Sequence, residues 1–337
     1  MAVLPEPSAL DVRIGDPGAD GAGRPGTGPA GAALPVDADE SLYLVGRPKL
    51  RQFLRFIRDH AVDPPAEGVL GAEWEEARAR IVELEKTEAG LAERPTIRKV
   101  EVDSKYRPLL AELLKDPLVR NGFNTVPTEV AFVELDRMVV YQKHIDLTYV
   151  RELQGRLGRS PGDEEVFRTC LPFDHPRPPF KWSRLDGESF VFVSRSNDLR
   201  FLGAMPLEPG HVRDTPHPGS LVGVVGLAVG YGSNFLNAVH CEDRLVLNNG
   251  SHRAYALREL GIREVPCIVQ HVSTREELEM VGSAELRRDP DLYLKHPRPS
   301  LLKDYFDPRL RRVAAVRRLV RQIRVRYSVS ECFVPAL

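Results

Sequence analysis

The sequence predicts an α/β (α+β) fold built on a small mixed sheet. Three observations lead to this prediction. Apolar residues repeat at helical spacing before residue 120, strand-like apolar runs follow it, and segment 245–269 has the pattern of a strand, a helix and a second strand. The chain has 337 residues, of which 42% are hydrophobic and 28% charged, so it can bury a substantial core.

The N-terminal part divides into two regions. Residues 1–40 are dominated by Gly, Pro and Ala and show no periodicity, so we expect a disordered tail. Residues 41–120 are expected to form a helical support region, with amphipathic helices over Leu50–Ile57 and Trp74–Leu84 and a third at about Pro108–Lys115. The second helix has a strongly acidic outer face.

Residues 121–275 are expected to form the central domain. Val130 and Phe132 indicate one strand and residues 138–141 another, after which Asp146 is expected to cap a helix. The Pro-rich stretch 158–188 has the composition of a long loop, and it opens an expected insertion at about 158–235.

Residues 276–337 are expected to form a C-terminal helical extension. Eight arginines and no acidic residue lie between Pro308 and Tyr327, and Val313, Val316, Val320 and Ile323 share one helical face. This pattern indicates a basic amphipathic helix. Three roles remain open for it: packing against the acidic helix 73–88, a nucleic-acid contact, and a partner or membrane-surface helix.

Several bulk properties narrow the class of protein. The net charge of -1 argues against a general polyanion binder. The four scattered cysteines form no CxxC pair and no metal-ligand spacing, so reduced thiols and no metal site are expected. We also find no signal peptide and no apolar run of the length that crosses a bilayer, which favours a cytoplasmic protein without a membrane span.

The most informative segment is the hinge, which we define as residues 248–253, Asn-Asn-Gly-Ser-His-Arg. It joins an apolar strand to a helix. The first backbone N–H groups of a helix lack intrahelical acceptors, and together with the helix dipole they can hold an anion. Gly250 allows close approach of a ligand to the backbone, and Arg253 carries a guanidinium suited to phosphate or carboxylate.

The hinge and its surroundings resemble the signature of the ParB/sulfiredoxin superfamily. The resemblance rests on Asn249–Arg253 followed by an alanine-containing helix, Gly261 and a Val265-Pro266 strand. The upstream segment VELDRMVVYQKHIDLTYVREL, with Gln142, is similar to the opening of such domains. The two pieces cover about fifty residues.

The resemblance implies nucleotide binding, with ATP or CTP and Mg²⁺ as the expected cofactor. It assigns the phosphate contacts to Asn249, Gly250, Ser251, His252 and Arg253, with Gln142 beside them. Ser251 stands where sulfiredoxins place a catalytic cysteine, which argues against sulfinic acid reduction. Asn249 stands where the free-serine kinases of the superfamily have an acidic residue, and an amide cannot act as a general base.

A carboxylate from elsewhere could supply that base. Glu129, Glu134, Asp136 and Asp146 are the candidates, and we take Glu134 with His252 as the catalytic pair. A second polar turn, which includes Arg195, Asn197 and Arg200, could form a second wall of the site; an ordinary turn is the alternative.

Three functions follow as hypotheses. The first is an ATP-dependent phosphotransferase acting on a small molecule or a protein hydroxyl. The second is a nucleotide-binding switch or adaptor without turnover. The third is a DNA-binding protein of the partition type. It ranks last because we see no helix-turn-helix region after the central domain.

Overall fold

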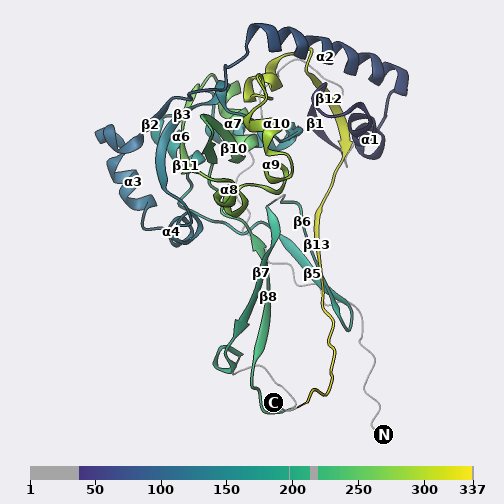
Figure 1. Cartoon of the computed structure of the whole chain (residues 1–337), viewed down its shortest axis with the longest axis vertical. Coiled ribbons are helices and arrows are strands. Elements are labelled where there is room, and N and C mark those ends of the chain that lie inside the picture. The colour runs from purple at the N-terminus through teal and green to yellow at the C-terminus, as the bar shows by residue number, and fades with distance from the viewer. Residues whose placement is uncertain (1–37, 197, 213–218, 336–337) are drawn as a thin grey trace. The chain divides into compact units, whose positions relative to one another are not determined.

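The computed structural model describes residues 38–196, 198–212 and 219–335 of the chain. The fold is mixed α/β, as the sequence predicts, with helices and several small sheets (Figure 1). The chain divides into two compact units. The described part of the larger unit comprises residues 38–175 and 233–318. The described part of the smaller unit comprises residues 176–196, 198–212, 219–232 and 319–335.

The larger unit contains a five-stranded mixed sheet. Its strand order is β10 (Arg244–Asn249), β9 (Asn237–Cys241), β11 (Glu264–His271), β3 (Thr128–Glu134) and β2 (Ile97–Lys99). Strands β9 and β11 are parallel, whereas the other neighbours are antiparallel. The strands expected around residues 130–132, 244–249 and 265–271 are all present. The expected strand at 138–141 is wrong: only Val139 forms isolated bridges, to Val246 and Leu301.

A second sheet in the larger unit joins segments that are far apart in the sequence. Its order is β12 (Arg311–Arg317), β1 (Ala38–Leu44) and β4 (His144–Asp146). Strand β1 pairs with β12 along its whole length, from Ala38 opposite Arg317 to Leu44 opposite Arg311. The expectation of a disordered tail over 1–40 is therefore wrong for residues 38–40, and residues 1–37 lie outside the described residues.

The prediction of a basic C-terminal helix is also wrong. Residues 311–317 form β12, and residues 321–326 form β13 (Arg321–Arg326) in the smaller unit. Both strands contain β-branched residues, Val313 and Val316 in β12 and Ile323 and Val325 in β13, and such residues favour strands although their spacing also suits a helical face. The acidic helix does attract the arginines, since Arg309 lies 2.9 Å from Glu83 and Arg312 pairs with Glu73.

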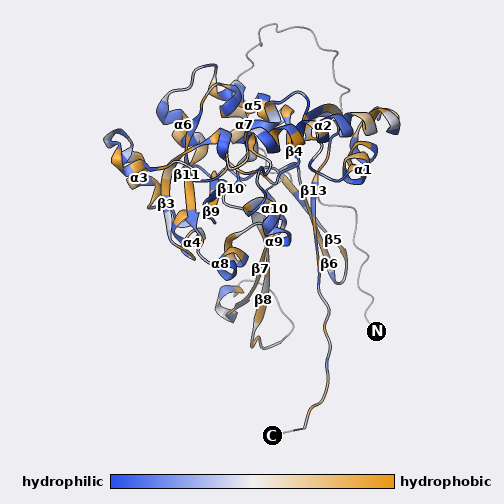
Figure 2. Cartoon of the chain, turned by 45° about the horizontal axis from the view of Figure 1, so that its top comes forward, coloured by the Kyte–Doolittle hydropathy of each residue, from blue (hydrophilic) through white to orange (hydrophobic). Residues whose placement is uncertain are grey.

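The N-terminal helices confirm the periodicity of the sequence. They are α1 (Leu50–His60), α2 (Glu67–Thr87), α3 (Arg107–Leu113) and α4 (Pro117–Gly122). Each of them buries apolar residues, and Figure 2 shows hydrophobic and hydrophilic residues side by side along α2 and α3. Pro108 lies in the first turn of α3, where its missing N–H leaves no intrahelical bond unmade.

The remaining helices surround the five-stranded sheet or follow it. They are α5 (Leu147–Leu157), α6 (Asp163–Cys170), α7 (Ser251–Glu259), α8 (Arg275–Val281), α9 (Ala284–Arg288) and α10 (Pro290–Leu294). The Asp146 carboxylate accepts the Tyr149 N–H at 3.0 Å, which confirms the predicted cap of α5. Helix α6 was not expected, because its sequence lies in the stretch interpreted as a Pro-rich loop.

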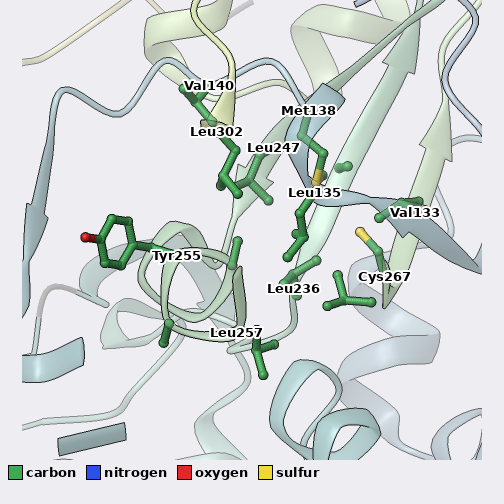
Figure 3. Packing of buried hydrophobic residues seen from close by; sticks show 14 of the residues in the cluster. Val133, Leu135, Met138, Val140, Leu236, Leu247, Tyr255, Leu257, Cys267 and Leu302 are labelled. Carbon is green, nitrogen blue, oxygen red and sulfur yellow. The ribbon is translucent and has the colours of Figure 1, made fainter. Parts of the chain in front are cut away.

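The core of the larger unit packs around α7. Figure 3 shows Leu135, Met138 and Leu247 beside the helix that carries Tyr255 and Leu257, with Cys267 of β11 close by. All of these side chains are buried. Five consecutive residues of α7, from Arg253 to Leu257, are buried, so close packing holds the start of the helix in a fixed place.

The smaller unit is built from strands. Strands β5 (Phe180–Asp186), β6 (Ser189–Ser194) and β13 form one sheet, and β7 (Leu199–Leu207) pairs with β8 (Val224–Tyr231) in a second. In the sequence, β6 precedes and β7 follows the polar segment that contains Arg195. Among the residues that the structure describes, no helix in either unit is long and apolar enough to span a bilayer.

Candidate functional site

The hinge connects β10 to α7 through a single left-handed residue. Gly250 has φ +97° and precedes the first residue of α7, Ser251. A Cβ at this position would lie 3.1 Å from Leu236 Cγ and 3.2 Å from Leu236 Cα. Glycine is therefore required by the backbone angle and also favoured by the tight approach to the loop before β9.

The two asparagines of the hinge serve the framework. Asn249 Nδ2 donates to the carbonyl oxygens of Ser233 and Phe235 at 3.0 and 3.1 Å, and its Oδ1 accepts the Gly250 N–H at 2.9 Å. Asn248 Oδ1 accepts the Ser283 N–H at 3.1 Å. Both amides thus fix the turn and hold it to neighbouring loops.

Arg253 is buried, with 5% of its surface exposed. Its Nη1 donates to the carbonyl oxygens of Thr169 and Cys170 at 3.2 Å and of Asn234 at 2.5 Å. Arginine binds carbonyl oxygens in this manner when it closes the end of a helix or loop. Arg253 therefore ties the C-terminal end of α6 and the loop before β9 to the hinge.

His252 differs from the other hinge side chains. Its Nε2 is buried and has no hydrogen-bond partner among the residues that the structure describes. Its ring meets the ring of Tyr149 edge to face, with 5.7 Å between the centroids. Burial, followed by the nearby charges of His144 and Arg253, lowers the pKa of His252 to about 4, so the imidazole is neutral at pH 7.

The segment after β3 contacts β10 and the hinge through Val139 and Tyr141. Val139 exchanges backbone hydrogen bonds with Leu245 and Leu247 at 2.9 Å, and the Tyr141 hydroxyl donates to the carbonyl oxygen of Asn248 at 2.5 Å. Gln142 follows directly and is partly exposed. The structure thus brings Tyr141 to the hinge, whereas the hydrogen bond recorded for Gln142 is with Tyr305, whose hydroxyl donates to its carbonyl oxygen.

Glu134, the expected catalytic base, lies elsewhere. It pairs in register with Glu264, whereas Asn249 is level with Asn237 and Ile268, and Ile268 is opposite Val130. Glu134 is thus separated from the hinge by two intervening strands and by about 13 Å along β3. The structure does not bring it to the start of α7.

The other carboxylates are engaged in framework contacts. Asp136 pairs with Arg258 and Arg263, each at 2.5 Å. Glu129 Oε1 lies 2.8 Å from His271 Nε2. Asp146 caps α5.

The expected second wall belongs to the smaller unit. Arg200 lies 3.3 Å from the Asp198 carboxylate and contacts Gly232, and Arg195 is exposed. The Ser196 N–H bonds to Ser194 Oγ at 3.1 Å, which is the local hydrogen bonding of an ordinary turn. Asn197 lies outside the described residues.

Residues of β4 and α5 near the hinge were missed at the sequence level. They are His144, which acts electrostatically on His252, and Tyr149. Both follow Gln142 within seven residues, in the segment that carries the family resemblance. Two cavities, of about 370 and 380 Å³, are lined by residues outside the hinge. In the described part of the chain, no group of three or more His, Cys, Asp or Glu side chains could hold a metal ion.

Comparisons with known proteins add no relative. No protein-family model matches the chain, and neither a curated protein nor a solved structure matches it significantly.

Proposed function

We propose that the chain binds a phosphate group of a nucleoside triphosphate, ATP or CTP, at the start of α7. The observation that carries this proposal is the unpartnered, enclosed Nε2 of His252 in the first turn of a helix. A buried polar atom without a partner is costly, and a phosphate oxygen would supply one. The backbone N–H groups of Ser251, His252 and Arg253 would bind the same anion.

The rest of the hinge supports binding through preorganisation. Asn249 and Arg253 hold the turn through carbonyl contacts, and Gly250 adopts the left-handed backbone angle that the turn requires. Arg253 would then act by positioning the helix start and by its positive charge. Tyr141, which precedes Gln142, holds the first residue of the turn through the carbonyl oxygen of Asn248.

The arrangement favours a nucleotide-binding switch or adaptor over a phosphotransferase. Phosphotransfer needs a group that orients or deprotonates the acceptor, together with carboxylates for Mg²⁺. Glu134 is distant from the hinge, Asp136 is held by two arginines, and Asp146 caps a helix. Any Mg²⁺ would therefore be bound mainly by the phosphates.

The test measures nucleotide binding and γ-phosphate release in the same samples. Wild-type protein is titrated with ATP, CTP and GTP with and without Mg²⁺, and compared with H252Q and with H211Q as the matched control. We expect H252Q to weaken binding about tenfold and H211Q to leave it unchanged. The proposal would be contradicted if no nucleotide bound to the wild-type protein, or if the wild type and H252Q bound nucleotide equally well. Release of γ-phosphate would instead favour the phosphotransferase hypothesis.

R253A is a poor test of this function, because removing a buried guanidinium also disturbs the fold. S251A is more informative, since Ser251 is only partly buried and sits at the first position of α7. Loss of a hydroxyl donor to phosphate would weaken binding by several fold without a change in stability.

A further inference from the structure

The five-stranded sheet carries a cavity at its edge, away from the hinge. Strand β2 ends at Lys99, opposite Ala131, while β3 continues to Thr128. A cavity of about 380 Å³ opens beside this extension, and helices α3 and α4 contribute to its wall. The volume is in the range of small-molecule sites, toward its lower end.

Most of the cavity wall is apolar. It is formed by side chains from α3 and the residue after it, α4, the residue after α4, β3 and β11: Leu110, Leu114, Val119, Phe123, Val130 and Ile268. Leu114 is 51% exposed, so apolar surface is available at the opening. Covering such surface is favourable, and the wall therefore suits a branched aliphatic or aromatic group.

Four charged side chains also line the cavity, and they differ in their partners. Lys99 lies 3.6 Å from Glu129 Oε2, and Glu129 Oε1 contacts His271. The opposite charges of Lys99 and Glu129 therefore compensate each other. Arg120 and Glu101 are both exposed, and neither side chain takes part in an ion pair with a described residue, including each other.

The Arg120 guanidinium and the Glu101 carboxylate thus lie beside an apolar wall without an ion-pair partner among the described residues. A ligand with only a carboxylate would satisfy Arg120 and face Glu101 unfavourably, and an amine would do the opposite. A molecule that carries an ammonium and a carboxylate group on the same carbon atom, next to an apolar body, complements all three features.

We propose that this cavity is a binding site for a free α-amino acid with a large apolar side chain. The carboxylate of the ligand pairs with Arg120, its ammonium group with Glu101, and its side chain packs against the apolar wall. The site is separate from the nucleotide site, so the two proposals stand or fall independently.

The experiment is a calorimetric or NMR titration of the full chain with L-leucine and L-phenylalanine. Leucinamide, which lacks the carboxylate, and N-acetyl-L-leucine, which lacks the ammonium group, serve as matched probes. We expect at least one of the amino acids to bind and each blocked analogue to bind about tenfold more weakly, because each loses one charged contact.

Substitutions of Arg120 and Glu101 test which charged group of the ligand each of these side chains binds. R120Q should weaken leucine binding about tenfold and leave leucinamide binding unchanged, while E101Q should weaken leucine and leave N-acetyl-leucine unchanged. R159Q, at an exposed arginine elsewhere, is the control. L114D should abolish binding, and its exposed position allows the protein to fold.

Several outcomes would overturn the proposal. These are no binding of either amino acid to the wild-type chain, equal binding of leucine and its two blocked analogues, and binding that R120Q and L114D leave intact. Tighter binding of N-acetyl-leucine than of leucine would also overturn it, because the site would then be one for amphipathic anions.

Discussion

Arg253 Nη1 lies 2.5 Å from the carbonyl oxygen of Asn234, a residue nineteen positions earlier in the chain. The same nitrogen bonds to the end of α6. The guanidinium thus joins the loop before β9, the end of α6 and the hinge into one rigid turn.

R253A should therefore reduce stability strongly. The substitution removes the guanidinium donor from three backbone carbonyl oxygens, of which that of Cys170 keeps the Leu236 N–H, and it creates a cavity. We expect a loss of about 3 kcal/mol in the free energy of unfolding. Urea denaturation measures it, with R156A on the exposed face of α5 as the control. A loss similar to that of the control would refute the structural role.

Gly250 and Gly261 form a matched pair of glycines. Both have positive φ, +97° and +87°, but a Cβ at Gly250 would crowd Leu236, while one at Gly261 would meet no atom within 4 Å. G261A should cost about 1 kcal/mol of backbone strain, and G250A about 1 kcal/mol more. Thermal unfolding of the two variants gives the difference, and an equal loss would show that the turn relaxes freely.

His252 should make the fold sensitive to mild acid. Its pKa is lowered to about 4 in the folded chain, below the value near 6.5 in the unfolded chain, so the unfolded state takes up a proton first. Stability contributed by the neutral imidazole is present above pH 6.5 and is lost as the pH falls toward 4.

H252Q should flatten this dependence. We expect the wild type to lose on the order of 1 kcal/mol more than the variant between pH 7 and 5, as measured by urea denaturation at each pH. His144, His240 and His296, whose pKa values are also lowered by burial, remain in both proteins and provide the common background. Parallel pH profiles would contradict this role of His252.

A buried ion pair anchors the segment before β12. Arg298 is fully buried, and its Nη1 and Nη2 bind the two carboxylate oxygens of Asp304 at 2.9 and 2.5 Å. D304N leaves a buried guanidinium with reduced compensation, so we expect a loss of about 3 kcal/mol or more. D291N removes an exposed carboxylate that also pairs with cations, and it should cost less than 1 kcal/mol. Similar losses of unfolding free energy in D304N and D291N would show that burial of the Arg298–Asp304 pair does not increase its contribution to stability.

Local patterns predicted much of the fold because their causes are local. The hinge, the stop at Gly261 and the cap at Asp146 each depend on the conformational preference of one residue. The helices at 50–60 and 67–87 follow from apolar periodicity. These features do not depend on which distant segment packs against them.

The errors arose where distant partners decide the structure. Residues 311–317 become a strand because β1 offers a strand edge of matching length. That partner is distant in the sequence, since Ala38 and Arg317, which lie opposite each other, are 279 positions apart. The position of Glu134 and the burial of Arg253 likewise depend on strand order and on loops from elsewhere in the chain. Residue type alone carries no information on these contacts.

The pairing of β1 with β12 also has a consequence for biosynthesis. Ala38 leaves the ribosome early, but its partner Arg317 is made only after 279 further residues. The sheet that contains β4 therefore cannot be completed while most of the chain is still being translated, and an apolar strand edge stays exposed during that time. Closure of this long loop should make folding slow and largely post-translational, with a period in which chaperones can bind the waiting edge.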